Sequence, residues 1–149
     1  MAERNYIFRF ETKTAHYGAD AFAVRCFDNR FWKTFKRFIK HLGIDHIDAE
    51  AVAGGAKIFS SPEKESDRDF MLRELEKSIL LHHTTRVLLF THEDCGAYGG
   101  SGRFDGNKDK EFAYHIAEHK KARNVIESKF PGMLIETYFI DFEGVVKTS

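Results

Sequence analysis

The chain has 149 residues, about the length of one domain, so a second independent fold is not expected. Lysine and arginine number 23, as do aspartate and glutamate, so the net charge is zero and the basic surface of a nucleic-acid-binding protein is not expected. An apolar fraction of 42%, with 15 phenylalanines, is ample for a packed core and argues against disorder over residues 1–149.

The first third of the chain combines short apolar runs with one patterned helix. Residues 1–20 are expected to form an N-terminal arm or an edge strand, because residues 6–10 partly alternate. Residues 21–26 form an apolar run with the length of a buried strand. Apolar residues then recur at offsets of four, three and four, which predicts a helix with one buried face that Gly43 can end. The recurring residues are Phe31, Phe35, Phe38 and Leu42.

Strands and helices also alternate in the rest of the chain. A helix is expected to begin at a Ser66 or Asp67 cap and to end at His82–His83, whose side chains the helix dipole favours there. The other expected elements are strands over residues 47–52, 86–90 and 134–140 and a helix over residues 110–130. Residues 86–90 are almost continuously apolar, as in a parallel sheet covered on both faces. The predicted fold class is therefore α/β, with a small, mostly parallel sheet flanked by helices.

The chain contains only two cysteines, Cys26 and Cys95. Two are too few for a disulfide scaffold and are typical of a reducing compartment. The first residues lack the apolar stretch of a signal peptide, and no run approaches the roughly 18 apolar residues of a membrane helix. We therefore expect a cytoplasmic protein with no membrane partner, in which functional cysteines would act as thiolates.

Both cysteines follow predicted parallel strands, at the carboxyl ends where open α/β sheets place their ligand sites. Cys26 ends one strand, while His92 and Cys95 lie on the loop after another. Two thiolates and an imidazole suit zinc, and three protein ligands leave a fourth tetrahedral position open for water, as in catalytic sites. The sequence therefore predicts a zinc ion held by Cys26, His92 and Cys95.

Asp28 and Arg30 lie close to this predicted site in the sequence. Two thiolates cancel the charge of zinc, so a water on the metal would need help to ionise. Asp28 can accept a hydrogen bond from a zinc-bound hydroxide, and Arg30 can hold Asp28 ionised and oriented. We predict that these two residues are catalytic.

These motifs resemble those of the β-class carbonic anhydrase family, of which the chain would be a small, bacterial-type member. The family's Cys-x-Asp-x-Arg and His-x-x-Cys-Gly motifs are both present, and a Gly-Gly turn between them is similar to the family's Asn-Ala-Gly-Gly turn. The matching positions are Cys26, Asp28, Arg30, Ala53, Gly54, Gly55, His92, Cys95 and Gly96. The resemblance covers most of the chain, from about residue 21 to the closing segment with Glu143-Gly144-Val145.

The resemblance implies a homodimer or a higher homo-oligomer that uses Zn²⁺ to hydrate CO2 reversibly to bicarbonate, by attack of a zinc-bound hydroxide. It also implies that Gly54, Gly55 and Gly96 lie at the substrate-binding site. In this family an aspartate at the position of Asp28 can instead bind the metal and displace water, which gives an inactive state.

The sequence departs from the family pattern in two places. Ala51-Val52 replaces a polar Arg-Asn pair before the turn, and the first 20 residues contain no counterpart of the family's helical arm or its substrate-pocket glutamine. Relatives with the same ligands act on carbonyl sulfide or carbon disulfide. The alternatives are therefore a hydrolase of those substrates, a catalytically silent zinc-binding assembly module, or a redox or oxyanion-binding protein that lacks metal when reduced.

Other patterns have simpler interpretations. His115 and His119 are four residues apart on a predicted helix, which suits a metal, but no third ligand is evident nearby. The glycines between residues 96 and 106 lack the Gly-Lys-Ser/Thr ending of a phosphate-binding loop, so we expect a flexible loop beside the metal. Singly, each cysteine would be an ordinary buried thiol. The combined motif favours zinc.

Overall fold

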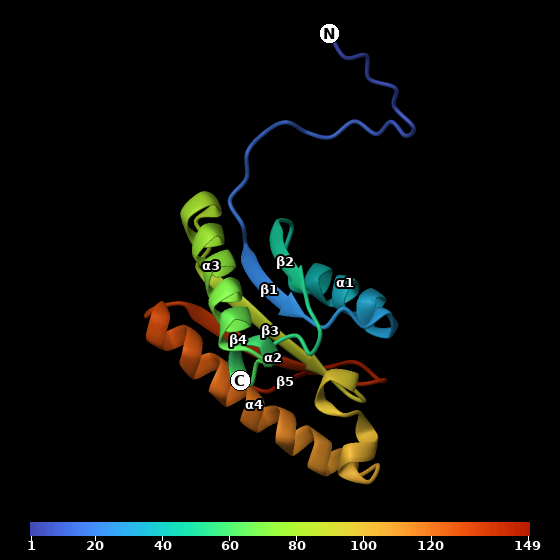
Figure 1. Cartoon of the computed structure of the whole chain (residues 1–149), viewed down its shortest axis with the longest axis vertical. Helices are drawn as coiled ribbons and strands as arrows, with labels where there is room; N and C mark the ends of the chain where they lie inside the picture. The colour runs from blue at the N-terminus through green and yellow to red at the C-terminus, as the bar shows by residue number, and fades with distance from the viewer.

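A computed structural model describes residues 1–149, and its core is one five-stranded sheet (Figure 1). The strands are β1 (Ala21–Arg25), β2 (Ile47–Ala51), β3 (Arg86–His92), β4 (Leu134–Ile140) and β5 (Val145–Lys147). Their order across the sheet is β2-β1-β3-β4-β5. The first four are parallel, and β5 is antiparallel to β4. The predicted α/β class with a mostly parallel sheet is confirmed.

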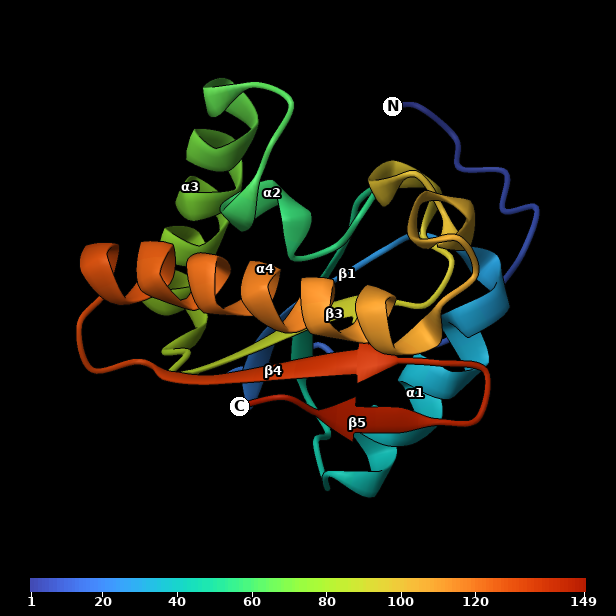
Figure 2. The ribbon, with the colours of Figure 1, turned by 90° about the horizontal axis from the view of Figure 1, so that it is seen from below.

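Helices cover both faces of the sheet. They are α1 (Trp32–His41), α2 (Lys57–Ser60), α3 (Glu65–His82) and α4 (Lys108–Lys129), with 3₁₀ turns η1 (Asn29–Phe31), η2 (Gly96–Tyr98) and η3 (Ser101–Phe104). Figure 2 shows α2, α3 and α4 on one side of the sheet and α1 on the other. No helix of the chain has the length and apolar character required to cross a membrane.

The sheet separates two apolar cores, because successive strand residues point to opposite faces. Phe22 and Val24 of β1 pack with Phe59, Met71, Leu75 and Ile126 from α2, α3 and α4. Ala21 and Ala23 face the other core with Phe31, Phe35 and Ile39, from η1 and α1. The four residues of β3 from Val87 to Phe90 alternate between the two cores in the same way. Burial on both faces explains why this strand is almost continuously apolar.

Helices α1 and α4 begin and end close to the residues predicted from the sequence. Phe35 and Ile39 are buried on α1, which ends at His41 before Gly43, where φ is 72°. The side chain of Asn107 accepts a hydrogen bond from the N–H of Lys110 at 3.0 Å and so caps α4. This cap fixes the end of α4 that lies nearest the loop after β3.

Two local predictions are wrong. Of the two expectations for residues 1–20, the edge strand is wrong: residues 6–10 pair with no neighbouring strand, and residues 1–20 form an arm that extends away from the sheet (Figure 1). Helix α3 begins at Glu65 rather than after a Ser66 or Asp67 cap, and Lys64 precedes it without a side-chain cap. Acidic residues in its first turn, Glu65 and Asp67, favour the helix start through the dipole instead.

Candidate metal centre

The carboxyl ends of β1 and β3 meet at one edge of the sheet, because these strands are adjacent and parallel. Cys26 directly follows β1, His92 ends β3, and Cys95 lies at the start of η2. The two sulfurs and a ring nitrogen of His92 all lie within 4.8 Å of one another. No other group of three or more histidine, cysteine or acidic residues in the chain is arranged in this way. The structure thus brings together the three residues predicted to bind zinc.

The orientation of His92 is fixed by the backbone. Its ring is 2% exposed, and Nδ1 lies 2.7 Å from the carbonyl oxygen of Glu93, which can only accept a hydrogen bond. In the neutral ring Nδ1 therefore carries the proton and Nε2 keeps a free lone pair, and Nε2 has no hydrogen-bond partner. The ring of Phe31 packs on His92 with 4.5 Å between ring centroids. A buried, unpartnered nitrogen beside two thiols fits a metal ligand.

The two thiols differ in pKa. The neighbouring Cys95 thiol lowers the pKa of Cys26 despite burial, and His92 and the backbone N–H groups of Asp28 and Gly54 lower it further. The pKa of Cys95 is raised by the Cys26 thiolate and by burial. Burial lowers the pKa of His92, but the Cys26 thiolate and a backbone carbonyl outweigh it and raise that pKa. Two thiolates this close together would repel each other. A bound cation would relieve that repulsion and favour the ionised form of both thiols.

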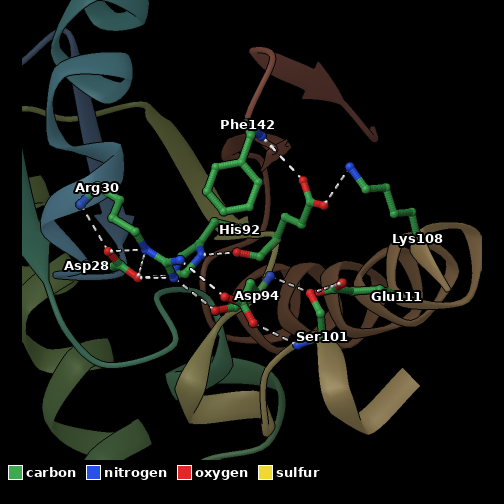
Figure 3. A network of polar contacts seen from close by, with 9 residues as sticks. Asp28, Arg30, His92, Asp94, Ser101, Lys108, Glu111 and Phe142 are labelled. Carbon is green, nitrogen blue, oxygen red and sulfur yellow. Dashed lines mark hydrogen bonds and ion pairs between the residues drawn. The ribbon is translucent and has the colours of Figure 1, made fainter. Parts of the chain in front are cut away.

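Asp28 and Arg30 form an ion pair beside His92 (Figure 3). Arg30 Nη2 lies 2.8 Å from Asp28 Oδ2, and Arg30 Nε lies 3.1 Å from both carboxylate oxygens. Asp28 Oδ2 is 3.8 Å from the unpartnered Nε2 of His92. The guanidinium of Arg30 lowers the pKa of Asp28 to about 2, so this carboxyl is ionised at neutral pH.

The Gly-Gly turn packs directly against both strand ends. Gly55 has φ 56°, and a Cβ there would lie 2.2 Å from the carbonyl oxygen of Phe90 and 2.8 Å from the nitrogen of Cys26. Only glycine fits such an approach. The N–H of Gly54 donates a hydrogen bond to Cys26 and lowers its pKa. Gly96 starts η2 directly after Cys95. All three glycines predicted at the substrate site therefore adjoin the cysteines.

The turn keeps its shape without the polar pair that Ala51 and Val52 replace. The N–H of Val52 donates to the carbonyl of Arg25 at 2.9 Å, and the N–H of Gly55 donates to the carbonyl of Val52 at 3.1 Å. Backbone hydrogen bonds therefore hold the turn beside β1.

His115 and His119 belong to no cluster of three possible metal ligands. His119 is hydrogen-bonded to the hydroxyl groups of Thr91 and Thr148, each at 2.7 Å. His115 is buried among aromatic rings, including Tyr98 and Phe139, and its two ring nitrogens have no hydrogen-bond partner. Unlike His92, His115 has no cluster of other possible ligands around it. Burial lowers the pKa of His115 to about 3, which keeps it neutral in the core.

Two acidic residues of the site were missed by the sequence predictions. Asp94 contacts Arg30, and Glu111 on α4 contacts the loop that carries Asp94. Asp94 lies between His92 and Cys95, which was a usable signal. The signal for Glu111 is weaker: it shares the buried face of α4 at helical spacing with Ala122 and Ile126.

Comparison with known sequences identifies the family. The family described as "Putative carbonic anhydrase" matches residues 18–148 of this chain. An uncharacterized protein of Rickettsia conorii is 27% identical over 133 residues, which cover 87% of this chain and 71% of the relative. An uncharacterized protein of Rickettsia bellii is 25% identical over 133 residues, covering 87% of this chain and 80% of the relative.

Solved structures share the fold at low sequence identity. A carbonic anhydrase from Glaciozyma antarctica matches with a TM-score of 0.59 and 21% identity, over 90% of this chain and 84% of that one. A β-carbonic anhydrase of Trichomonas vaginalis matches with a TM-score of 0.60 and 13% identity, over 94% and 87%. A carbon disulfide hydrolase matches with a TM-score of 0.53 and 16% identity, over 89% and 81%. The chain therefore belongs to the family described as "Putative carbonic anhydrase" and has the fold of the β-carbonic anhydrases.

Proposed function

We propose that this protein is a zinc-dependent carbonate dehydratase that reversibly hydrates CO2 to bicarbonate. The observation that carries the proposal is the buried, unpartnered Nε2 of His92, which lies with the sulfurs of Cys26 and Cys95 in a group no wider than 4.8 Å. Family membership supports the reaction class, and the ion pair of Asp28 with Arg30 supplies an ionised carboxylate beside the ligand atoms.

Each residue has a defined task in this proposal. Cys26, His92 and Cys95 would hold zinc, which when bound lowers the pKa of water to about 7 and so supplies a nucleophile at neutral pH. Asp28 is ionised, so it can accept but not donate a hydrogen bond. A group that donates a hydrogen bond to the Asp28 carboxylate would therefore be held in one direction. Arg30 holds Asp28 in this state through three short contacts between Arg30 Nε or Nη2 and the carboxylate oxygens.

The surroundings of the ligand atoms suit an uncharged substrate. A cavity of only about 10 Å³ lies beside Cys26 and His92, and its wall combines Phe31, Phe35, Phe90 and Ile140 with Arg25 and Thr91. The apolar side chains beside the ligand atoms favour an uncharged molecule such as CO2 over an ion. Carbonyl sulfide and carbon disulfide are uncharged as well, and they are the substrates of the second candidate function.

We also propose that the chain works as a homodimer or a higher homo-oligomer. The arm of residues 1–20 exposes Tyr6, Ile7, Phe8 and Phe10. An exposed apolar segment of this kind is typical of a protein contact. Sedimentation analysis of the full chain and of a chain without residues 1–16 tests this. A monomeric full chain would contradict it.

The deciding experiment is stopped-flow CO2 hydration between about pH 6 and 9, with zinc measured in the same sample. We expect a rate well above that of buffer, rising with pH, and a large loss in Asp28→Asn at unchanged zinc content. Full zinc without CO2 hydration would contradict the proposal. Turnover of carbonyl sulfide or carbon disulfide would then support the hydrolase. The absence of turnover with all of these substrates would support the silent zinc module. A reduced protein without zinc would favour the redox or oxyanion-binding alternative.

A further inference from the structure

Glu111 is a buried carboxylate on α4, a helix that supplies none of the proposed zinc ligands. It is 2% exposed, and Oε1 accepts a hydrogen bond from the N–H of Asp94 at 2.6 Å. Oε2 accepts one from the hydroxyl of Ser101 at 2.9 Å (Figure 3). No lysine, arginine or histidine forms an ion pair with Glu111. Both of its carboxylate oxygens therefore accept hydrogen bonds from donors of the loop after β3.

The Asp94 backbone depends on this contact. Asp94 has φ 56°, one of only three non-glycine residues in the chain with positive φ. This conformation is strained for a residue with a side chain. Glu111 accepts from its N–H, and the N–H of Ser101 donates to its Oδ1 at 2.9 Å. Asp94 is thus held through both its backbone and its side chain.

Asp94 in turn presents two acceptors to Arg30. Arg30 Nη1 lies 3.1 Å from Asp94 Oδ2, and Arg30 Nη2 lies 3.1 Å from the carbonyl oxygen of Asp94. The Arg30 side chain is 47% exposed, so packing alone does not fix it. It is fixed because Asp94 binds its outer nitrogens while Asp28 binds Nε and Nη2. A continuous chain of hydrogen bonds therefore links Glu111 to Asp28 (Figure 3).

We propose that Glu111 is a positioning residue of the metal centre, which fixes the direction of the Asp28 carboxylate through Asp94 and Arg30. This inference rests on the proposed function, because Asp28 must act at the metal for its direction to matter. Glu111 touches none of the proposed ligands. Its effect must therefore depend on the presence of the Asp28 carboxylate, and that dependence separates it from a residue that only stabilises the loop.

A double-mutant cycle on the zinc-loaded protein measures this dependence. Glu111→Ala should lower kcat for CO2 hydration by about 10-fold, the equivalent of one hydrogen bond to a charged group. Glu111→Gln should stay within about 3-fold of wild type, because its amide can still accept from the N–H of Asp94 and donate to the Ser101 hydroxyl. In an Asp28→Asn background, Glu111→Ala should have no further effect on kcat.

Glu136 of β4 offers a matched control, because it is another buried carboxylate with several hydrogen bonds. It is bound by Arg86 and Tyr138, away from the proposed ligands. Glu136→Ala should lower the melting temperature and leave kcat unchanged. The proposal is overturned if Glu111→Ala lowers kcat equally with and without Asp28→Asn, or if it behaves like Glu136→Ala.

Cobalt substitution gives a readout that does not require turnover. The visible absorption bands of Co²⁺ report its coordination geometry. At one fixed pH they should change in Glu111→Ala relative to wild type, and should not differ between Asp28→Asn and the double variant. If the wild type binds Co²⁺ but does not hydrate CO2, the proposed function fails while the cobalt comparison still decides the role of Glu111. Identical spectra in all four proteins overturn the positioning role, and a chain that binds neither metal overturns both proposals.

Discussion

The two ends of the sheet each place an aspartate near a histidine and an aromatic ring, but they differ in how the polar groups are satisfied. At the amino end, Asp48 accepts hydrogen bonds from the hydroxyls of Tyr17 at 2.7 Å and Ser78 at 2.6 Å. His82 Nδ1 lies 2.7 Å from the same carboxylate. None of the buried polar side-chain atoms at this end lacks a partner. At the carboxyl end, by contrast, the buried Nε2 of His92 has none.

This difference separates a structural cluster from a candidate functional one. Buried polar groups in folded proteins are almost always paired, so an unpaired one calls for a ligand or another specific cause. The amino-end cluster joins the root of the arm to β2 and α3, because Tyr17 lies before β1 while Asp48 and His82 lie on those two elements. It agrees with a structural role for His82 at the end of α3. Substitutions at the two ends should therefore affect different properties.

The largest effect is expected from Cys95→Ala at the carboxyl end. This change removes one of three proposed metal ligands, so zinc affinity should fall by more than about 100-fold, beyond the cost typical of losing an outer hydrogen-bond partner of a ligand. CO2 hydration should disappear with the metal. Zinc content after dialysis and the hydration rate of the same sample test this. Stoichiometric zinc in this variant would contradict the ligand assignment.

Gly55→Ala should damage the same end through the backbone. The new Cβ would approach the carbonyl oxygen of Phe90 to 2.2 Å in a left-handed conformation, so we expect a loss of about 3 kcal/mol in the free energy of unfolding. Gly43→Ala is the matched control. Gly43 also has positive φ, but a Cβ there meets nothing within 4 Å, so only about 1 kcal/mol of strain is expected. Equal losses in urea denaturation would show that the close approach to β3 is unimportant.

Asp48→Asn tests the amino end. Burial alone would raise the pKa of Asp48, but hydrogen bonds from Ser78, His82 and Tyr17 outweigh it and lower that pKa. Losing the charge should cost about 1–2 kcal/mol of stability. Zinc content and hydration rate should match those of the wild type, because no proposed ligand contacts this cluster. A parallel fall in activity would mean that the two ends are coupled.

The ease of prediction from sequence also differs within the molecule. The run from Val87 to Phe90 indicated a buried strand because each of its residues is covered by one core or the other. Cys26 and His92 could be placed together because adjacent parallel strands end at the same edge. The prediction of an edge strand over residues 6–10 failed because a strand requires a pairing partner, and the local alternation of apolar residues does not reveal one.

Contacts between distant segments were also beyond prediction. The contact of Glu111 with Asp94 spans 17 residues, and it depends on how α4 docks beside the loop after β3. The contacts of Asp48 with Tyr17 and His82 depend likewise on the packing of three separate segments. Local patterns predict elements and strand ends, whereas the partners of single polar side chains follow from tertiary packing.

The smallest predicted effect is the contribution of the Asp28 charge to stability, which Asp28→Asn isolates because asparagine can still cap η1. Arg30 lowers the folded-state pKa of Asp28 to about 2, below the ordinary value of 3.8. The unfolded state therefore binds more protons between these values. The stabilisation is fully present above about pH 4 and is lost as the pH falls through about 2.

Because Arg30 is half exposed, solvent screens the pair, and we expect about 1 kcal/mol at pH 7. Urea denaturation of the metal-free wild type and Asp28→Asn at pH 7, 5, 4 and 3 measures the difference, with chelator present to remove any contribution from metal. The difference should be constant from pH 7 to 5 and shrink below pH 4. A difference that grows on acidification would require Asp28 to be protonated in the folded protein, and the carboxylate would then not be the acceptor that the proposed reaction requires.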